Sequence, residues 1–137
     1  MYILYKTMST FITAFTLSAL NVGDYVVAAG GSYNGNITCK KVAQDSVNTY
    51  LGFVQYASPA NSTVTVQLMG AMDQTKTGLI VGAWYYADPS NPGGVTSTMP
   101  TGTMVIQVVG KAVYSNVIDT SLGYLIEGTG GGGGSPT

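Results

Sequence analysis

Hydrophobic and polar positions alternate over short runs along most of this chain. The runs are rich in β-branched and aromatic residues, and Gly, Pro, Asn and Asp interrupt them at short intervals. Such a pattern is typical of strands joined by tight turns. Asn34-Gly35 suits a hairpin turn, because both residue types accept positive φ angles. The pattern predicts strands at residues 25–28, 36–41, 51–57, 63–69, 83–87, 94–98, 104–114 and 123–127.

The fold class that follows is all-β, because no segment keeps a helical period over three turns. Residues 10–20 and 42–50 fit the strand pattern least well, and a short helix is the alternative in both stretches. Over residues 11–18, however, odd positions carry Phe, Thr, Phe and Leu, and even positions carry Ile, Ala, Thr and Ser. This alternation favours an extended arm or an edge strand near the N-terminus.

Four short blocks of the sequence recur in the same order with nearly constant spacing. They are residues 22–28 with 81–87, 36–38 with 94–96, 51–54 with 109–112, and 64–68 with 122–126. Short β segments often look alike, so coincidence is the alternative explanation. A true duplication predicts two four-strand units, residues 22–69 and 81–127, packed around one core as a small barrel or sandwich.

The length of 137 residues fits one domain. We expect an N-terminal arm at residues 1–20, a β-barrel domain at 21–127 and a glycine-rich tail at 128–137. Neither end fits the duplicated unit, so both are expected to be docking arms and not parts of the barrel. Residues 7–22 are too polar for the apolar core of a signal peptide or for a membrane span. The candidate protein-interface residues are Phe11, Phe15, Gly130, Gly131, Gly132, Gly133 and Gly134.

Charged residues are few. Five Lys and six Asp or Glu make up 8% of the chain, whereas a typical soluble domain has about a quarter. Five scattered lysines without any arginine form no basic stripe, which argues against nucleic acid as a partner. The exposed surface must therefore consist largely of uncharged polar groups, which are easily desolvated. We expect other protein surfaces to cover much of it.

The same composition argues against catalysis. Without His and Arg the chain lacks the usual general base, the usual metal ligand and the bidentate anion clamp. Cys39 is the only cysteine, so it can form no intramolecular disulfide and no cysteine-based zinc site, and we interpret it as a small core or interface residue. The carboxylates stand singly in turn contexts, which is typical of turn caps. We predict that the protein is not an enzyme and uses no cofactor or metal.

One aromatic cluster is prominent, consisting of Trp84, Tyr85 and Tyr86 with Asp88 just beyond. Alternation in a strand sends Trp84 and Tyr86 to one face and Tyr85 to the other. A barrel needs large residues in its core, which favours core packing for at least one of these faces. The alternative is a platform on which sugar rings or bases stack.

The second half of the chain carries a series of short motifs anchored by glycines. The series reads Gly78-Leu79-x-x-Gly82-x-x-Tyr85-Tyr86-x-Asp88-Pro89, then Pro92-Gly93-Gly94-Val95-Thr96, then Val108-Val109-Gly110-Lys111-Ala112. It resembles a small β module found in structural proteins of tailed bacteriophages, in capsid decoration or cement proteins, head fibres and parts of tail fibres. The match is clearest over residues 51–117, about half of the chain. The polyglycine run at 130–134 departs from the module.

The resemblance implies a small β-barrel, commonly trimeric, on the outer surface of a virus particle, with no catalytic residues. Its partners would be other copies of the chain and the major capsid protein, and neither nucleic acid nor a membrane. Two functions stay open at this point. The first is capsid decoration, in which the protein bridges neighbouring shell subunits, and the short chain favours it. The alternative is a fibre module that recognises host-surface glycan through Trp84, Tyr85 or Tyr86.

Overall fold

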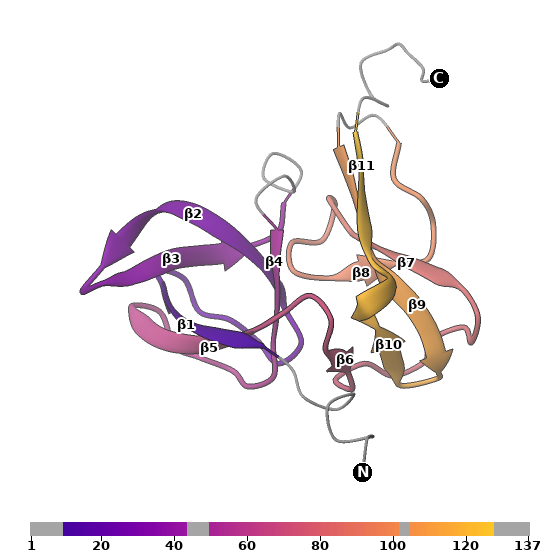
Figure 1. The fold of residues 1–137 in the computed structure, drawn as a ribbon, viewed down its shortest axis with the longest axis horizontal. Coiled ribbons are helices and arrows are strands. Elements are labelled where there is room, and N and C mark those ends of the chain that lie inside the picture. The colour runs from indigo at the N-terminus through magenta and orange to yellow at the C-terminus, as the bar shows by residue number, and fades with distance from the viewer. Residues whose placement is uncertain (1–9, 44–49, 102–104, 128–137) are drawn as a thin grey trace.

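Two β-sheets lie side by side in the computed structural model of the chain, which describes residues 10–43, 50–101 and 105–127 (Figure 1). The first sheet consists of β1 (Phe11–Thr16), β2 (Tyr25–Tyr33), β3 (Asn36–Lys41), β4 (Tyr50–Val54) and β5 (Ser62–Leu68). The second consists of β6 (Met72–Asp73), β7 (Trp84–Ala87), β8 (Val95–Thr96), β9 (Val105–Tyr114), β10 (Val117–Asp119) and β11 (Tyr124–Glu127). A 3-10 turn, η2 (Thr120–Leu122), joins β10 and β11.

All eight predicted strands are present, which confirms the all-β class. The strands β6 and β10 were not predicted, because two and three residues are too few to show alternation. The helical alternative for residues 10–20 is wrong, since part of this stretch forms β1. In the other doubtful stretch, residues 44–49 lie outside the described residues.

The strand β1 belongs to the barrel. It pairs antiparallel with β5 over six residues and parallel with β3 at Phe15 and Thr16, and these pairings close the first sheet into a barrel. Ala14 and Thr16 point into the barrel and are completely buried. The prediction of an arm separate from the barrel is therefore wrong for residues 11–16, because this strand supplies part of the core. Residues 1–9 of the predicted arm lie outside the described part of the chain.

The internal duplication is visible in the order of the strands. Around the barrel the order is β3-β2-β4-β5-β1, and across the second sheet it is β8-β7-β9-β10-β6. Each unit therefore contains five strands and not the four that the sequence predicts. The first unit is a closed barrel, because β1 pairs with β3. In the second unit the equivalent strands, β6 and β8, lie at opposite ends of the strand order. The strand β11 is an addition to the second unit and pairs with β9.

The strand register repeats in detail between the two units. Val26 of β2 pairs with Gly52 of β4, and Tyr85 of β7 pairs with Gly110 of β9. A bulge follows each of these pairs on the same side. Two unrelated sheets have no reason to share both a cross-strand glycine and an adjacent bulge. The matched features therefore support a true duplication.

The turn that leads into each unit's second strand is also repeated. The amide of Gly23 donates to the carbonyl of Val54 at 2.8 Å, and the amide of Gly82 donates to the carbonyl of Ala112 at the same distance. The φ angles of Gly23 and Gly82 are 85° and 88°. Only glycine adopts such angles without steric cost, so both turns need it.

The fourth pair of repeated blocks, residues 64–68 and 122–126, does not occupy equivalent places in the two units. Val54 pairs with Val66 of β5, and the equivalent Ala112 pairs with Ile118 of β10. The counterpart of β5 is therefore β10, and the alignment of residues 64–68 with 122–126 is wrong. Residues 122–126 show the same alternation as β5, but they form the additional strand β11. The alignment failed because the connection after β9 is much shorter than the connection after β4.

Apolar side chains form two clusters where the sequence predicts one. One cluster fills the barrel, and the other lies between the outer face of the barrel and the inner face of the second sheet. Because the first unit closes into a barrel around its own core, the second unit packs against the outer surface of that barrel. The barrel cluster comprises Ala14, Leu20, Val26, Cys39, Val54, Val64 and Val66. The cluster between the sheets comprises Tyr25, Val27, Val42, Phe53, Ala71, Tyr85, Ala87, Val109, Ala112 and Ile118.

Candidate functional site

An aromatic surface covers the outer side of the second sheet. Trp84 is 37% exposed, and its ring packs nearly perpendicular to that of Tyr124 at a centroid distance of 6.1 Å. The ammonium nitrogen of Lys111 lies 5.5 Å from the centre of the Trp84 ring, a cation–π contact. Tyr86 lies on the same side of the sheet as Trp84, two residues along β7. We call the surface formed by Trp84, Tyr86, Lys111 and Tyr124 the Trp84 face.

The duplication gives the Trp84 face a buried counterpart in the barrel. By register, Trp84 corresponds to Tyr25 and Lys111 corresponds to Phe53. Tyr25 and Phe53 have no exposed surface, because the inner face of the second sheet covers them. The same position in the fold is thus covered in the first unit and uncovered in the second. No described part of the chain plays the covering role for Trp84.

The three aromatic residues that the sequence singles out do not form one platform. Tyr85 is buried between the sheets, and its hydroxyl oxygen accepts a hydrogen bond from the amide of Ile80 at 2.8 Å. Trp84 and Tyr86 lie on the opposite side, as strand alternation predicts, and Tyr86 is half-buried. Lys111 lies over one face of the Trp84 ring.

The predicted interface residues of the N-terminal segment have different environments. Phe11 is exposed at the start of β1. Phe15 is buried, and its ring stacks on that of Tyr33 with a centroid distance of 4.3 Å. The five glycines at 130–134 lie outside the described residues.

A buried polar network, which the sequence pattern did not predict, joins the two sheets. Asp73 of β6 has no exposed surface. Its carboxylate accepts hydrogen bonds from the Tyr25 hydroxyl at 2.5 Å, from the Thr75 hydroxyl at 2.5 Å and from Lys76 Nζ at 3.0 Å. Lys76 also donates to the carbonyl of Gly23 at 2.8 Å. A signal was present in the run Asp73-x-Thr75-Lys76, but the partner Tyr25 lies too far away in sequence to be inferred.

Tyr50 lies next to this network but does not join it. Its hydroxyl is buried and has no hydrogen-bond partner within the described structure. Its ring stacks on that of Tyr25 at a centroid distance of 6.0 Å. Burial, and secondarily the negative charge of Asp73, raise the pKa of Tyr50 well above its ordinary value. The folded protein therefore strongly favours the neutral phenol.

We expect Tyr50→Phe to stabilise the protein by about 1 kcal/mol at neutral pH, because it removes a buried hydroxyl that makes no hydrogen bond. The gain should increase above pH ~10, where the unfolded chain ionises Tyr50 and the folded chain retains the proton. Because the folded-state pKa of Tyr50 is raised, the wild-type protein has its full stability below the unfolded-chain pKa and loses stability as the pH rises above it, whereas Tyr50→Phe has no phenol at this position to ionise. Urea unfolding at pH 7 and in alkali measures both effects. Equal stability of the two proteins throughout would contradict the assignment.

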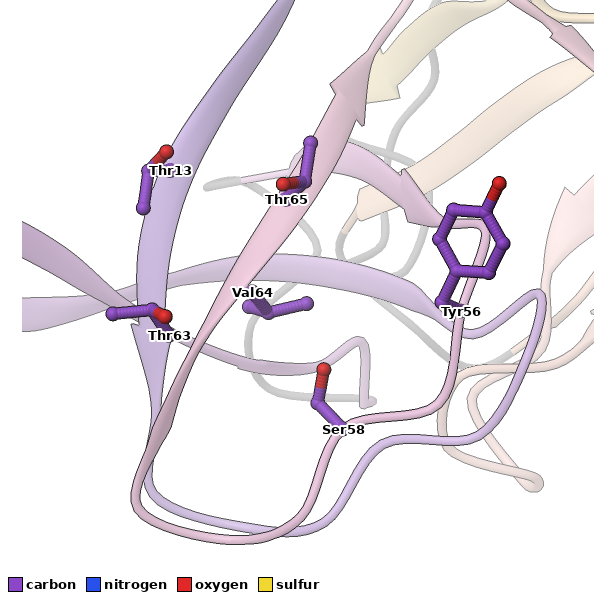
Figure 2. Close-up of a pocket in the computed structure, with 6 residues that line it drawn as sticks. All are labelled: Thr13, Tyr56, Ser58, Thr63, Val64 and Thr65. Atoms are coloured by element: carbon purple, nitrogen blue, oxygen red, sulfur yellow. The ribbon is translucent and has the colours of Figure 1, made fainter.

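The described residues line at least two surface hollows. One has a volume of about 310 Å³ and lies on β1, β5 and the loop between β4 and β5 (Figure 2). We call it the Tyr56 hollow, and its lining residues are Thr13, Tyr56, Ser58, Thr63, Val64 and Thr65. The second has a volume of about 260 Å³ and is formed by the loop on either side of β8. It is lined by Asp88, Pro89, Ser90, Thr96, Thr98, Met99, Pro100 and Thr101.

Several carboxylates fix local turns. Asp24 accepts from the amide of Asn21 at 2.7 Å, and Asp88 accepts from the amide of Ser90 at 2.9 Å. Asp119 caps η2 by accepting hydrogen bonds from the amide and the hydroxyl of Ser121.

Within the described ranges, no group of three or more His, Cys, Asp or Glu residues could hold a metal ion. No helix in those ranges is long and apolar enough to cross a membrane.

No family model, curated protein or solved structure matches the chain. Evidence for function therefore comes from the residues and geometry described above.

Proposed function

We propose that the chain is a non-enzymatic structural protein of a virus particle, which decorates the outer capsid surface of a tailed bacteriophage by bridging subunits of the major capsid protein. The observation that carries the proposal is the uncovered Trp84 face, whose counterpart around Tyr25 is buried by another sheet. Large aromatic side chains are the residues that dominate protein interfaces. The resemblance of residues 51–117 to phage decoration modules supplies the virion context.

The low charge of the chain agrees with this function. Charged residues are 8% of the sequence, so covering the surface requires little desolvation of charge. The charges that do lie on the described surface are partly neutralised within the fold. Lys41 lies 3.6 Å from Asp24. We propose that the chain forms a homotrimer. Its closed symmetry would let neighbouring subunits cover one another on the shell.

The arrangement of the carboxylates argues against the enzymatic alternatives. Asp24, Asp88 and Asp119 accept hydrogen bonds from amides of their own turns. Asp73 is sealed between the sheets, with Tyr25 and Lys76 as partners. A glycosidase requires two carboxylates that face one substrate, and neither of the two hollows described above is lined by more than one of these four side chains.

The decisive measurement is the copy number of the protein on purified particles. Decoration predicts a number that scales with that of the major capsid protein, whereas a fibre or vertex fitting predicts far fewer copies. Light scattering of the isolated protein gives its oligomeric state, for which we expect three chains. A protein that is absent from the particle, or present at a few copies only, would overturn the decoration proposal.

Trp84→Ala should weaken attachment to the shell by at least about 30-fold, because truncating a central aromatic residue costs roughly 2 kcal/mol or more. Tyr114→Ala is the matched control, since Tyr114 is 67% exposed at the hairpin end of β9 and is not part of the Trp84 face. Binding of each purified variant to particles stripped of the protein gives the two affinities. Full binding by Trp84→Ala would place the docking surface elsewhere.

A further inference from the structure

The Tyr56 hollow has a lining of one chemical kind. Its six residues are uncharged, and four of them end in an aliphatic hydroxyl. Figure 2 shows Thr13 on the neighbouring strand beside Thr63 and Thr65 of β5, with Tyr56 and Ser58 on the adjoining loop. A ligand with a net charge would find no counter-ion in this lining. An apolar ligand would desolvate the hydroxyls without returning their hydrogen bonds.

The hydroxyls of the hollow are available to a ligand. Thr13 and Thr65 are direct cross-strand partners, so their side chains lie side by side on one face. Thr63 lies on the same face, two residues before Thr65. Within the described residues these three hydroxyls have no hydrogen-bond partner in the protein. By contrast, the Thr16 hydroxyl, on the other face of β1, donates to the carbonyl of Ser18 at 2.6 Å.

Tyr56 adds an aromatic surface to this array. It is 75% exposed, and in the described structure no other aromatic ring or cation packs against it. Trp84 differs, since its ring contacts Tyr124 and Lys111. A free ring beside several hydroxyls combines an apolar plane with groups that both donate and accept hydrogen bonds.

The hollow is held in shape by the barrel. Leu20 is buried, and it exchanges two backbone hydrogen bonds with Ser58, at 2.8 and 3.0 Å. The amide of Asn61 donates to the carbonyl of Thr16 at 2.8 Å, and the Ser62 hydroxyl donates to the carbonyl of Pro59 at 2.6 Å. The threonine side chains have few rotamers, because they are β-branched. A ligand would therefore find a preformed site, and binding would require little ordering.

We propose that the Tyr56 hollow binds a neutral saccharide. The ring of Tyr56 contacts the apolar face of a sugar ring, and the hydroxyls of Thr13, Thr63 and Thr65 exchange hydrogen bonds with the sugar hydroxyls. The volume of about 310 Å³ is at the lower end of the range for small-molecule sites, roughly 300–1,000 Å³, which fits one or two sugar rings. This inference does not depend on the proposed docking of the Trp84 face.

The test uses the full chain and a panel of neutral saccharides, namely glucose, galactose, mannose and N-acetylglucosamine, each as the monosaccharide and as a short oligomer. Amide chemical shifts in ¹H–¹⁵N spectra report binding residue by residue. We expect at least one saccharide at millimolar concentration to shift the amides of Thr13, Tyr56, Ser58 and Thr65. Tighter binding of an oligomer than of its monomer would identify a surface polymer, and not a free sugar, as the source of the ligand.

Two variants assign the binding to the hollow. Tyr56→Ala should weaken the affinity by roughly tenfold, because it removes the aromatic contact, and Thr65→Val should weaken it without changing the shape of the site. Tyr114→Ala and Thr10→Val remove an exposed tyrosine and an exposed threonine outside the hollow, and they should leave the affinity unchanged. Absence of binding by every saccharide, or equal binding by Tyr56→Ala and Tyr114→Ala, would overturn the proposal. Binding to shells by Tyr56→Ala tests the decoration role separately.

Discussion

Gly52→Ala is expected to lower the free energy of unfolding by at least about 3 kcal/mol, a large part of the roughly 5–15 kcal/mol that keeps a domain folded. A Cβ atom on Gly52 would overlap the carbonyl oxygen of Gln67 and lie 2.8 Å from its carbonyl carbon. Gln67 is a paired residue of β5, so the clash involves backbone that cannot rotate away. The pairing of β4 with β5 would have to open. Urea or thermal unfolding of the purified variant measures the loss.

The duplication supplies a second test of the same packing. Gly110 is the counterpart of Gly52, and a Cβ there would overlap the carbonyl oxygen of Asp119 and lie 2.9 Å from its carbonyl carbon. Gly110→Ala should therefore destabilise the protein to a similar degree. Gly31→Ala is the control, because its Cβ would meet only the Thr38 hydroxyl, at 3.6 Å, and the cost should be about 1 kcal/mol or less. Equal stability of all three variants would show that the strands do not approach closely at the glycines.

Strand positions could be predicted from the sequence because alternation is a local property. In β5 and β7, for example, buried positions alternate with more exposed ones along the strand. The duplication could be predicted for a related reason, since Gly23 and Gly82 meet a local requirement for a positive φ angle that recurs in each unit. Gly52 and Gly110 recur at matching positions of the sequence, but the requirement for glycine there comes from the close approach of a neighbouring strand. What the sequence shows directly is therefore the part of the fold that neighbouring residues determine.

The unpredicted features depend on contacts between distant segments. Whether residues 11–16 form an arm or a barrel strand is decided by pairing with β3 and β5, which no local pattern reports. Closure of the barrel then places the second unit outside, buries Tyr25 and leaves Trp84 uncovered. The Tyr56 hollow likewise needs β1 beside β5 before Thr13 and Thr65 can meet. Residue types alone could not distinguish Trp84 from Tyr56 as the freer aromatic ring.

Asp73→Ala is expected to lower the free energy of unfolding by about 3 kcal/mol, because it leaves a partly buried cation and a buried hydroxyl without their shared acceptor. The two partners are Lys76 and Tyr25, at 3.0 and 2.5 Å from the carboxylate. Asp73 has no exposed surface, so water cannot replace it without entering the layer between the sheets. Asp88→Ala is the control, since within the described residues the Asp88 side chain accepts only an exposed amide of its own turn, and its loss should cost about 1 kcal/mol or less.

A double-mutant cycle with Tyr25→Phe separates the network from the packing around it. Tyr25 lies on β2 of the barrel and Asp73 lies on β6 of the second sheet, so their hydrogen bond joins the two units of the duplication. If the bond contributes as the geometry indicates, Tyr25→Phe will destabilise the native protein but will cost much less in the Asp73→Ala background, with a coupling energy of at least about 1 kcal/mol. Additive effects would mean that the two side chains contribute independently, and that apolar packing alone holds the second sheet on the barrel. Urea unfolding of the four proteins at pH 7 gives the result, because Tyr25 is neutral there in both the folded and the unfolded chain, its folded-state pKa being raised by burial.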